Sequence, residues 1–375
     1  MRVKNFQTSM RVLVTGANGF IGKNLVFRLI ELGFSVEIFT RNNTIQDLPN
    51  ILKKVNFVYH LAGENRPLDD KEFEIVNTDL TKSLCDAITA LNRNIPIVLT
   101  SSTQAKIDNP YGRSKLKAES ILKKFKDETG IPVFIYRLPG VFGKWSKPNY
   151  NSVVSTFCYN VCNNIPLQIN DASFELNLVY IDDLVLEFIS LIQEGTLNTK
   201  LSIEPEYKIS VGELANQLKL FENSRHSLLS EKVGDGLIRK LYSTYVSYFS
   251  PEQFSYSIPS YGDERGEFAE ILKTKNSGQF SFFTAEPGIT RGGHYHHTKT
   301  EKFLVINGEA RFGFRNIVTD EIHEIFTSDR KLEVIETIPG WSHDISNIGK
   351  SKMVVILWAN EIYDHNNSDT ISFKV

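Results

Sequence analysis

Cysteine is scarce in this 375-residue chain, with only Cys85, Cys158 and Cys162. So few thiols, set among apolar neighbours, exclude a disulfide framework and favour reduced cysteines in a cytoplasmic protein. Long hydrophobic runs are also missing, because no segment approaches the roughly 20 apolar residues that a membrane helix needs. The polar segment Met1–Met10 has no apolar signal-peptide core, so we expect an extension before the first strand.

An excess of one charge is the third absence. The chain has 42 basic and 44 acidic residues, for a net charge of −2. This balance argues against nucleic acid or a membrane surface as a partner. Apolar residues make up 41% and charged residues 23%, which is ordinary for a globular protein. Because 375 residues exceed the size at which one core usually suffices, we expect two domains.

A glycine-rich turn near the start of the chain is the strongest feature that is present. Val12–Val14 read as a buried strand, Gly16, Gly19 and Gly22 follow at regular spacing, and an apolar-periodic helix begins near Lys23. Strand, glycine turn and helix in this order suit a dinucleotide, because the backbone can approach a pyrophosphate and the helix N-terminus offers free N–H groups. The turn residues expected at this cofactor are Gly16, Asn18, Gly19, Phe20, Ile21 and Gly22.

The next two strands extend the expected cofactor site. Arg41 follows the strand predicted at 35–39, where an acidic residue would bind the ribose hydroxyls of NAD. An arginine there suits the 2′-phosphate of NADP, and the alternative is a solvent-exposed loop arginine. A buried strand predicted at 57–60 runs into a loop at its carboxyl end, the edge where ligands gather in parallel sheets. We expect His60 to be structural and the loop residues to contact the cofactor, namely Leu61, Ala62 and Gly63.

A tyrosine and a lysine after the following strand suggest proton transfer. Tyr111 and Lys115 are four residues apart at the start of a predicted helix, so they share one helix face. A free tyrosine has a pKa near ~10, and a nearby ammonium favours the phenolate and lowers that pKa. Ser101, Ser102 and Thr103 close the strand before them, and we favour Ser102 as the hydroxyl that holds a substrate carbonyl. This set suits carbonyl reduction by a nicotinamide; the alternative is an ordinary solvent-facing helix.

After Pro251 the helical periodicity disappears and short alternating runs with glycine turns predict an all-β sandwich or barrel. The predicted strands are 280–284, 302–306, 310–314, 331–335 and 353–358.

Three histidines and a glutamate in this second part form a metal-ligand pattern. His294 and His296 alternate along a strand and so share one face, Glu301 follows after a turn, and His343 would come from a facing strand. Three imidazoles and one carboxylate suit zinc or another first-row divalent ion. The alternative is a set of solvated or core histidines, and His297 lies between the expected ligands without being one.

Residues 11–243 resemble the extended short-chain dehydrogenase/reductase family, whose members act on nucleotide sugars. The matching residues are Thr15–Gly22, His60–Gly63, Asn77, Ser102, Tyr111, Lys115, Arg137–Gly143 and Leu178–Asp183. The resemblance implies a Rossmann-type doubly wound parallel sheet, a nicotinamide dinucleotide and a substrate lobe over residues 151–243. Asn56 and the Pro139–Gly140 pair depart from the family pattern, which leaves the detailed sugar contacts open.

Residues 251–375 resemble the cupin superfamily, which implies a cupin β-barrel holding a metal. Asp263–Glu270 and Gly288–Tyr295 also resemble the metal-free 3,5-epimerases of 4-keto-6-deoxy nucleotide sugars. In those enzymes the histidine equivalent to His294 is the catalytic base. His294 cannot be both ligand and base, since a metal-bound nitrogen cannot take a proton, and the full set with Glu301 and His343 favours the metal.

The fusion in this order resembles the bifunctional capsular polysaccharide synthesis enzymes. That resemblance implies a homodimer, zinc in the cupin and NADPH in the first domain. It also implies a UDP-linked substrate: C3 epimerisation of UDP-2-acetamido-2,6-dideoxy-4-hexulose in the cupin, then C4 reduction to UDP-2-acetamido-2,6-dideoxy-β-L-talose, a UDP-N-acetyl-L-fucosamine precursor of capsule or O-antigen. Candidates for the C3 base are Lys273, Tyr295 and Asp344.

Two other functions stay open. One is a single-activity reductase with a structural cupin. The other is a 4-epimerase or 4,6-dehydratase that retains NAD; Thr103–Gln104 lacks the Asp-Glu pair usual in dehydratases.

Overall fold

The computed structural model describes residues 10–67, 69–193, 201–331, 333–364, 366 and 368–375. The chain divides into two compact units: unit 1 holds the chain up to Leu218 together with Lys240–Tyr248, and unit 2 holds Lys219–Arg239 and Phe249–Val375. Over the described ranges, no helix combines the length and the apolar character needed to cross a membrane. The polar segment before Met10, which we expect to be an extension, lies outside the described residues.

Unit 1 is built on a five-stranded sheet in the order β2-β1-β3-β4-β5, with every neighbouring pair parallel. Its strands are β1 (Arg11–Thr15), β2 (Ser35–Phe39), β3 (Phe57–His60), β4 (Ile97–Ser102) and β5 (Val133–Leu138). Because the strands are parallel, their carboxyl ends meet at one edge, and the order reverses between β1 and β3. Ligands of such sheets bind at this point of reversal.

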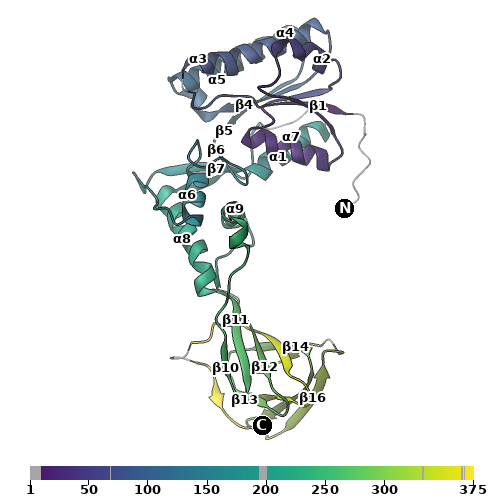
Figure 1. Ribbon diagram of the computed structural model, residues 1–375, viewed down its shortest axis with the longest axis vertical. Coiled ribbons are helices and arrows are strands. Elements are labelled where there is room, and N and C mark those ends of the chain that lie inside the picture. Colours follow the sequence, from purple (N-terminus) through teal and green to yellow (C-terminus); the bar gives the residue numbers. More distant parts are fainter. Residues whose placement is uncertain (1–9, 68, 194–200, 332, 365, 367) are drawn as a thin grey trace. The chain divides into compact units, whose positions relative to one another are not determined.

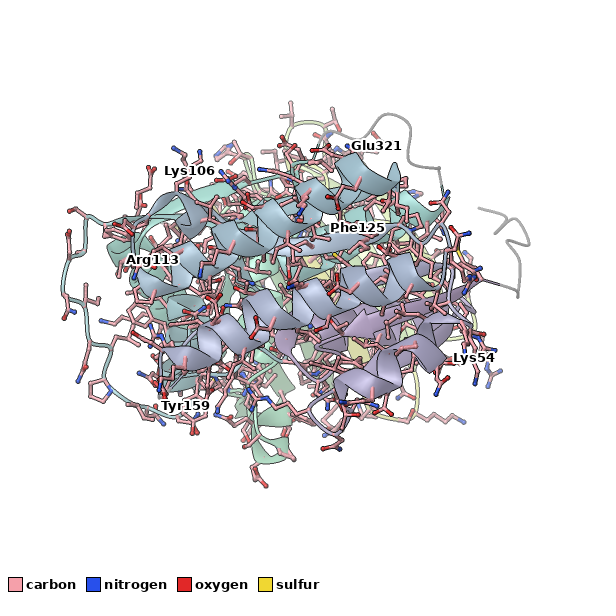
Figure 2. All side chains as sticks on the ribbon, turned by 90° about the horizontal axis from the view of Figure 1, so that it is seen from above. Lys54, Lys106, Arg113, Phe125, Tyr159 and Glu321 are labelled. Carbon is pink, nitrogen blue, oxygen red and sulfur yellow. The ribbon has the colours of Figure 1, made fainter. Side chains whose placement is uncertain are left out.

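Helices cover both faces of this sheet (Figure 1). One face carries α1 (Phe20–Glu31) and α7 (Ile181–Gln193), which pack against each other. The other carries α2 (Leu48–Leu52), α4 (Leu80–Ala90) and α5 (Pro110–Thr129). Figure 2 looks onto this second layer and shows α5 running from near Arg113 past Phe125. The doubly wound α/β fold predicted from the sequence is confirmed.

The helical segment between β3 and β4 is interrupted. The structure has α3 (Lys71–Phe73), then a π-helical segment η2 (Glu74–Asp79), then α4. A π-helical turn widens the helix locally, and such turns occur often at functional sites.

A smaller sheet lies mostly in the predicted substrate lobe, with its first strand just before residue 151. Strands β6 (Gly140–Phe142) and β7 (Glu175–Tyr180) pair in parallel, and β8 (Tyr207–Ser210) pairs antiparallel to β7. The lobe also contains α6 (Val153–Cys162), the start of α8 (Val211–Ser227) and part of α9 (Gly236–Val246). At the start of α8 the amide of Ser210 donates to Glu213, and the amide of Glu213 donates to the Ser210 hydroxyl, so the two residues form a capping box.

The core of unit 1 lies between the sheet and the α4/α5 layer. Leu13, Val58, Ile97 and Leu99 from the strands pack with Leu122 of α5, and all are buried. Strands β1, β3 and β4 are buried on both faces, as a sheet covered by helices on both sides requires. The three cysteines are free and buried, so they belong to the packed interior.

From Phe249 onward, unit 2 consists of β-strands apart from the short 3-10 helix η4 (Pro251–Phe254), which confirms the all-β prediction for this part of the chain. Its other segment, Lys219–Arg239, also carries the end of α8 and the start of α9. One sheet has the order β10-β11-β12-β19-β14-β17, with β9 beside β11, and the other has the order β16-β15-β18-β13-β20. The first sheet contains β9 (Leu229–Ser230), β10 (Tyr261–Asp263), β11 (Gly266–Thr274), β12 (Gly278–Ala285), β14 (Glu301–Asn307), β17 (Ile335–Glu336) and β19 (Met353–Ala359). The second contains β13 (Thr290–Tyr295), β15 (Glu309–Asn316), β16 (Ile322–Ser328), β18 (Trp341–Asn347) and β20 (Ile371–Ser372).

Alternating apolar side chains from both sheets, among them Phe283, Phe303, Phe312, Ile345 and Val355, form the core of unit 2. The assignment to the cupin superfamily stays a prediction.

One predicted strand of unit 2 and the predicted domain limits differ from the structure or stay untested. The strand predicted at 331–335 is wrong over the described part, where only β17 forms, and β16 was missed because its side chains are mostly exposed. The predicted domain limits, 11–243 and 251–375, stay a prediction. Lys219–Arg239 groups with unit 2 because β9 pairs with β11.

Candidate functional site

The glycine turn lies at the carboxyl end of β1 and leads directly into α1. Gly16 has φ +68°, and a Cβ on it would lie 2.6 Å from the amide nitrogen of Ala62. A Cβ on Gly22 would lie 2.2 Å from the carbonyl oxygen of Gly16. Gly19 is the N-cap of α1, so no side chain caps the first helical turn, and that turn has no acidic residue. The arrangement leaves free N–H groups for an anionic ligand.

The other predicted turn residues lie in the same place. Asn18 is exposed in the turn, and Phe20 and Ile21 open α1. A hollow of ≈ 310 Å³ lies beside the turn. It is lined by Ala17, Asn18, Lys23, Val26, Phe27 and Ile38.

The loop after β3 is fastened to the end of β1. The amides of Leu61 and Ala62 both donate to the Thr15 hydroxyl at 3.1 Å. His60 is fully buried, with one ring nitrogen 2.8 Å from Thr15 Oγ1 and the other 2.9 Å from Thr81 Oγ1. Burial, with a smaller effect of the Lys115 charge, lowers the pKa of His60 to about 3. His60 is thus neutral and hydrogen-bonded through both ring nitrogens, which supports the structural role expected for it.

Arg41 extends from the end of β2 to Glu64, which follows the loop after β3. The guanidinium lies 2.8 Å from the Glu64 carboxylate, and the two side chains are 91% and 8% exposed. Tyr150 donates to the same carboxylate at 3.0 Å. Because β1 lies between β2 and β3, this ion pair spans the point where the strand order reverses. Sequence reasoning missed Glu64 and Tyr150; the signal for Glu64 was a charged residue directly after Gly63.

Tyr111, Lys115 and Ser102 come together at the carboxyl end of β4. The Asn109 side chain caps α5 by accepting from the Gly112 amide at 2.7 Å, which fixes the turn that carries Tyr111. Lys115 Nζ donates to the carbonyl of Thr100 at 3.2 Å and lies 5.9 Å from the centroid of the Tyr111 ring.

The three candidate hydroxyls have different surroundings. Ser101 donates to Glu119 at 2.6 Å, and Arg137 binds the same carboxylate through two nitrogens, so Ser101 belongs to a structural network. Ser102 is partly exposed, accepts from the Gln104 amide at 3.1 Å, and lies near enough to Tyr111 to act on its pKa. Thr103 begins η3 (Thr103–Lys106) with an exposed side chain. Ser102 is therefore the hydroxyl that the structure brings to Tyr111.

The pKa shifts at this site differ from the expectation. Burial raises the pKa of Tyr111, and the hydrogen bond with Ser102 offsets only part of that rise. Burial lowers the pKa of Lys115 to about 8, partly offset by Glu119. The pKa of Tyr111 is therefore raised and not lowered as expected, because the loss of water around the phenol is the largest effect on it.

Asn77, in the π-helical segment η2, connects the pieces around Lys115. Its side chain accepts from the Glu64 amide at 2.9 Å and donates to the Ser114 hydroxyl at 2.9 Å. A Cβ on Gly63 would lie 2.8 Å from Lys115 Nζ and 3.1 Å from Asn77 Oδ1. A side chain at position 63 would therefore push the Lys115 ammonium out of its place.

In unit 2 the four predicted ligands form one cluster. His294, His296, Glu301 and His343 each offer a ligand atom, and these atoms all lie within 4.8 Å of one another. His294 on β13 is in register with His343 on β18, and Glu301 begins β14. Alternation along β13 brings His294 and His296 to the same side, as predicted, with ring centroids 5.0 Å apart.

The spacing inside the cluster fits a metal ion. Glu301 Oε2 lies 3.2 Å from His296 Nε2 and 3.3 Å from His343 Nε2. Ligand atoms at the corners of a tetrahedron around zinc, with bonds of about 2.0–2.1 Å, are roughly 3.3 Å apart. His343 Nδ1 is buried without a hydrogen-bond partner. These residues can hold a divalent ion.

The charges around the cluster keep the carboxylate ionised. Burial alone would raise the pKa of Glu301, but hydrogen bonds with His296 and His343, together with the Lys299 charge, hold it far below its ordinary value. Burial, with the neighbouring His343, lowers the pKa of His294 to about 4. Lys299 Nζ lies 2.9 Å from Glu301 Oε1. Sequence reasoning missed Lys299, because nothing local shows that this lysine is buried.

Two of the candidate C3 bases face away from the cluster. Tyr295 alternates with His294 and His296 and contacts His297 instead, with ring centroids 5.5 Å apart. Asp344 follows His343 on β18 and pairs with Arg311 at 2.7 Å. Because neighbouring strand residues point to opposite faces, neither lies beside the cluster. Lys273 pairs with Glu270 at 3.0 Å.

Comparison with known proteins agrees with both units. Residues 12–203 match the NAD dependent epimerase/dehydratase family, and residues 261–371 match the polysaccharide biosynthesis C-terminal domain. The UDP-2-acetamido-2,6-beta-L-arabino-hexul-4-ose reductase of Pseudomonas aeruginosa is 55% identical over 369 residues, covering 98% of this chain and 99% of that protein. The CDP-abequose synthase of Salmonella muenchen is 24% identical, covering 61% of this chain and 84% of that protein.

Solved structures resemble the chain as well. The capsular polysaccharide assembling protein CapF from Staphylococcus aureus superposes with a TM-score of 0.90 at 42% identity, covering 98% of this chain and 100% of that chain. A UDP-glucose 4-epimerase from Thermotoga maritima, with a TM-score of 0.55 and 20% identity over 64% of this chain and 98% of that chain, shares the fold of the first part only. The predicted resemblance to capsular polysaccharide synthesis enzymes is confirmed. The chain belongs to the NAD dependent epimerase/dehydratase family and carries the polysaccharide biosynthesis C-terminal domain after it.

Proposed function

We propose that unit 1 reduces the C4 ketone of a UDP-linked 2-acetamido-2,6-dideoxy-hexulose with NADPH. The observation that carries this proposal is the convergence of Ser102, Tyr111 and Lys115 at the edge of the sheet where its ligands bind. The P. aeruginosa relative, 55% identical over nearly the whole chain, is a reductase of a UDP-linked hexul-4-ose.

Each residue has a distinct task in this reaction. When bound, the reduced nicotinamide supplies the hydride. Ser102 holds the ketone oxygen, Tyr111 gives its hydroxyl proton to that oxygen as the C–O bond becomes single, and Lys115 stabilises the resulting phenolate. Arg41 has an exposed guanidinium that can bind a 2′-phosphate. The backbone that would hold the dinucleotide belongs to Gly16, Asn18, Gly19, Phe20, Ile21, Gly22, Leu61, Ala62 and Gly63.

Tyr111→Phe tests the reduction. The variant keeps the ring and its packing but has no proton to give, so NADPH oxidation should fall by about 10²–10⁴-fold. Exchange of the C3 proton with deuterated water should continue at the wild-type rate, because the other unit performs it. If both activities fall together, the two reactions are not divided between the units.

We further propose that the cluster of His294, His296, Glu301 and His343 holds a zinc ion and that C3 epimerisation takes place beside it. A 4-keto group makes the C3 proton acidic; a base removes it, and protonation from the other face inverts C3. A divalent ion in the cluster would supply positive charge for the enolate oxygen. Support comes from the tetrahedral spacing and from the match of residues 261–371 to a polysaccharide biosynthesis domain. His294 is then a ligand, and the base is a different residue.

His343→Ala tests the second reaction. Loss of one imidazole should remove the metal and stop C3 exchange, whereas reduction of a ketone that already has the inverted C3 should continue. Retention of exchange in the metal-free variant would leave unit 2 as a structural module beside a single reductase.

The protein is further proposed to be a homodimer. β16 is the outer strand of its sheet and exposes Ile322 (61%) and Phe326 (58%), which suits contact with a second copy. Sedimentation equilibrium measures the mass directly, and a single-chain mass at micromolar concentration would refute the dimer.

A further inference from the structure

We propose that the carboxyl-terminal segment from Asp369 onward is a strap that positions the metal-ligand cluster, with Asp369 as the positioning residue. The inference rests on the proposed zinc site. It assigns a role at that site to a segment that contributes none of the four candidate metal ligands.

The Asp369 carboxylate organises the turn between β13 and β14. It accepts the amides of His297, Thr298 and Lys299 at 2.9, 2.7 and 2.9 Å, and the Thr298 hydroxyl at 3.0 Å. Three successive backbone N–H groups converge on this one carboxylate, and they hold its pKa far below the ordinary value. The turn connects two ligands, His296 on one side and Glu301 on the other, so the carboxylate fixes the spacing between them.

The backbone of Asp369 acts on His296 directly. The Nδ1 nitrogen of His296 donates to the Asp369 carbonyl oxygen. Because Nδ1 is held by this carbonyl, Nε2 is the nitrogen that points into the cluster, where it lies 3.2 Å from Glu301 Oε2 and can bind a metal ion in place of a proton. A partner of this kind fixes the tautomer and the ring orientation of a ligating histidine.

The same turn also controls Glu301. Lys299, whose amide binds Asp369, places its Nζ 2.9 Å from Glu301 Oε1. That contact occupies one carboxylate oxygen and leaves Oε2 to face His296 and His343. Glu301 is thereby set to bind a metal through a single oxygen.

Residues after Asp369 hold the segment in place along the ligand-bearing strands. In β20, Ser372 pairs with His294 and Ile371 with Tyr295, and the Phe373 amide donates to Gly293 at 2.9 Å. The hydroxyl of Ser342, the residue before His343, donates to the Phe373 carbonyl. The strap therefore contacts β13, the ligand turn and β18.

The first test measures zinc affinity by competition with a chelator in full-length Asp369→Ala, Asp369→Asn and a control, Asp364→Asn. Asp364 lies in the same tail, is exposed, and accepts only from the Asn366 amide among the described contacts. We expect zinc affinity about 10–100-fold weaker in the Asp369 variants, as for other residues that hold a metal ligand, and unchanged in the control.

Saturating zinc should restore C3 exchange in Asp369→Asn, because a positioning residue acts through the metal ligands and does not touch the reacting atoms. Wild-type zinc affinity in both Asp369 variants would overturn the proposal. A wild-type protein that binds no zinc would give a different pattern, refuting the metal site itself and the strap with it.

Hydrogen exchange of the wild-type protein provides a test without any substitution, in case Asp369→Ala fails to fold. If the strap strengthens zinc binding, zinc must strengthen the docking of the strap by the same factor, because coupling between two sites is reciprocal. Zinc should therefore slow hydrogen exchange of the amides of residues 297–299 and of Phe373 by that factor. Equal exchange at these amides with zinc and with chelator would overturn the proposal, and amides of β1 in unit 1 serve as the internal reference.

Discussion

Lys115 in unit 1 and Glu301 in unit 2 are both 5% exposed, yet their charges are compensated very differently. Lys115 has the Thr100 carbonyl as its hydrogen-bond partner, and Glu119, the carboxylate whose charge acts on it, is held by Arg137 and Ser101. Glu301 has His296, His343 and Lys299 around it.

The same loss of water therefore has opposite outcomes. Burial moves Lys115 toward its neutral form, with a pKa of about 8, whereas the partners of Glu301 overcome burial and keep it ionised. A group poised between protonation states suits proton transfer, and a carboxylate held in one state suits a permanent ligand. Whether a buried charge has charged partners therefore distinguishes the proposed catalytic site from the proposed metal site more clearly than the residue types do.

Replacing Lys115 should have the largest effect of the predicted substitutions: it should lower the rate of NADPH oxidation but raise the stability of the protein. Lys115→Met removes the ammonium beside Tyr111, so kcat for NADPH oxidation should fall by about 10²–10⁴-fold. Zinc content should be unchanged, which confines the effect to unit 1. A wild-type kcat would mean that Lys115 has no part in the chemistry.

The stability of the same variant tests the uncompensated charge. The folded pKa of Lys115, about 8, is below the ordinary 10.5, so folding costs roughly 3 kcal/mol at any pH below 8 and less as the pH rises from 8 to 10.5. Lys115→Met should thus be more stable than wild type at pH 7, with the gain shrinking toward pH 10. Urea unfolding at both pH values measures the difference in the free energy of unfolding. If Lys115→Met is less stable than wild type at pH 7, Lys115 is not the uncompensated buried charge described above.

Replacing Glu301 should have the next largest effect, in the opposite unit. Glu301→Gln removes the single carboxylate of the cluster and leaves Lys299 buried without its counter-charge. Zinc affinity should fall by more than the roughly 100-fold expected for a residue that only holds a ligand, and unit 2 should unfold at a lower temperature. Calorimetry and chelator competition measure both, and Glu324→Gln, an exposed carboxylate on β16, is the control.

Replacing Arg41 should have the smallest effect. Arg41→Ala removes an exposed guanidinium, so the preference for NADPH over NADH in kcat/KM should fall by about tenfold, with kcat nearly unchanged. Arg28→Ala, an exposed arginine of α1 that pairs with Glu31, is the matched control. An unaltered preference would make Arg41 a solvent-exposed loop residue, the alternative that the sequence left open.

The sequence by itself determined the features that depend on local geometry. The spacing of Gly16, Gly19 and Gly22 requires a tight turn into a helix, and Tyr111 and Lys115 share a helix face because they are four residues apart. His294 and His296 share a strand face because side chains alternate. These relations hold wherever the chain forms the helix or strand, so they could be predicted without a tertiary structure.

Only the tertiary structure decided which distant residues meet. Strand order brings Glu64 to Arg41, the packing of α5 on β4 selects Ser102 over Ser101, and the return of the last residues along β13 brings Asp369 to the ligand turn. Burial is also a property of the whole fold, which is why the pKa of Tyr111 rises instead of falling. Contacts across such separations depend on strand register and packing, and no local pattern in the sequence encodes them.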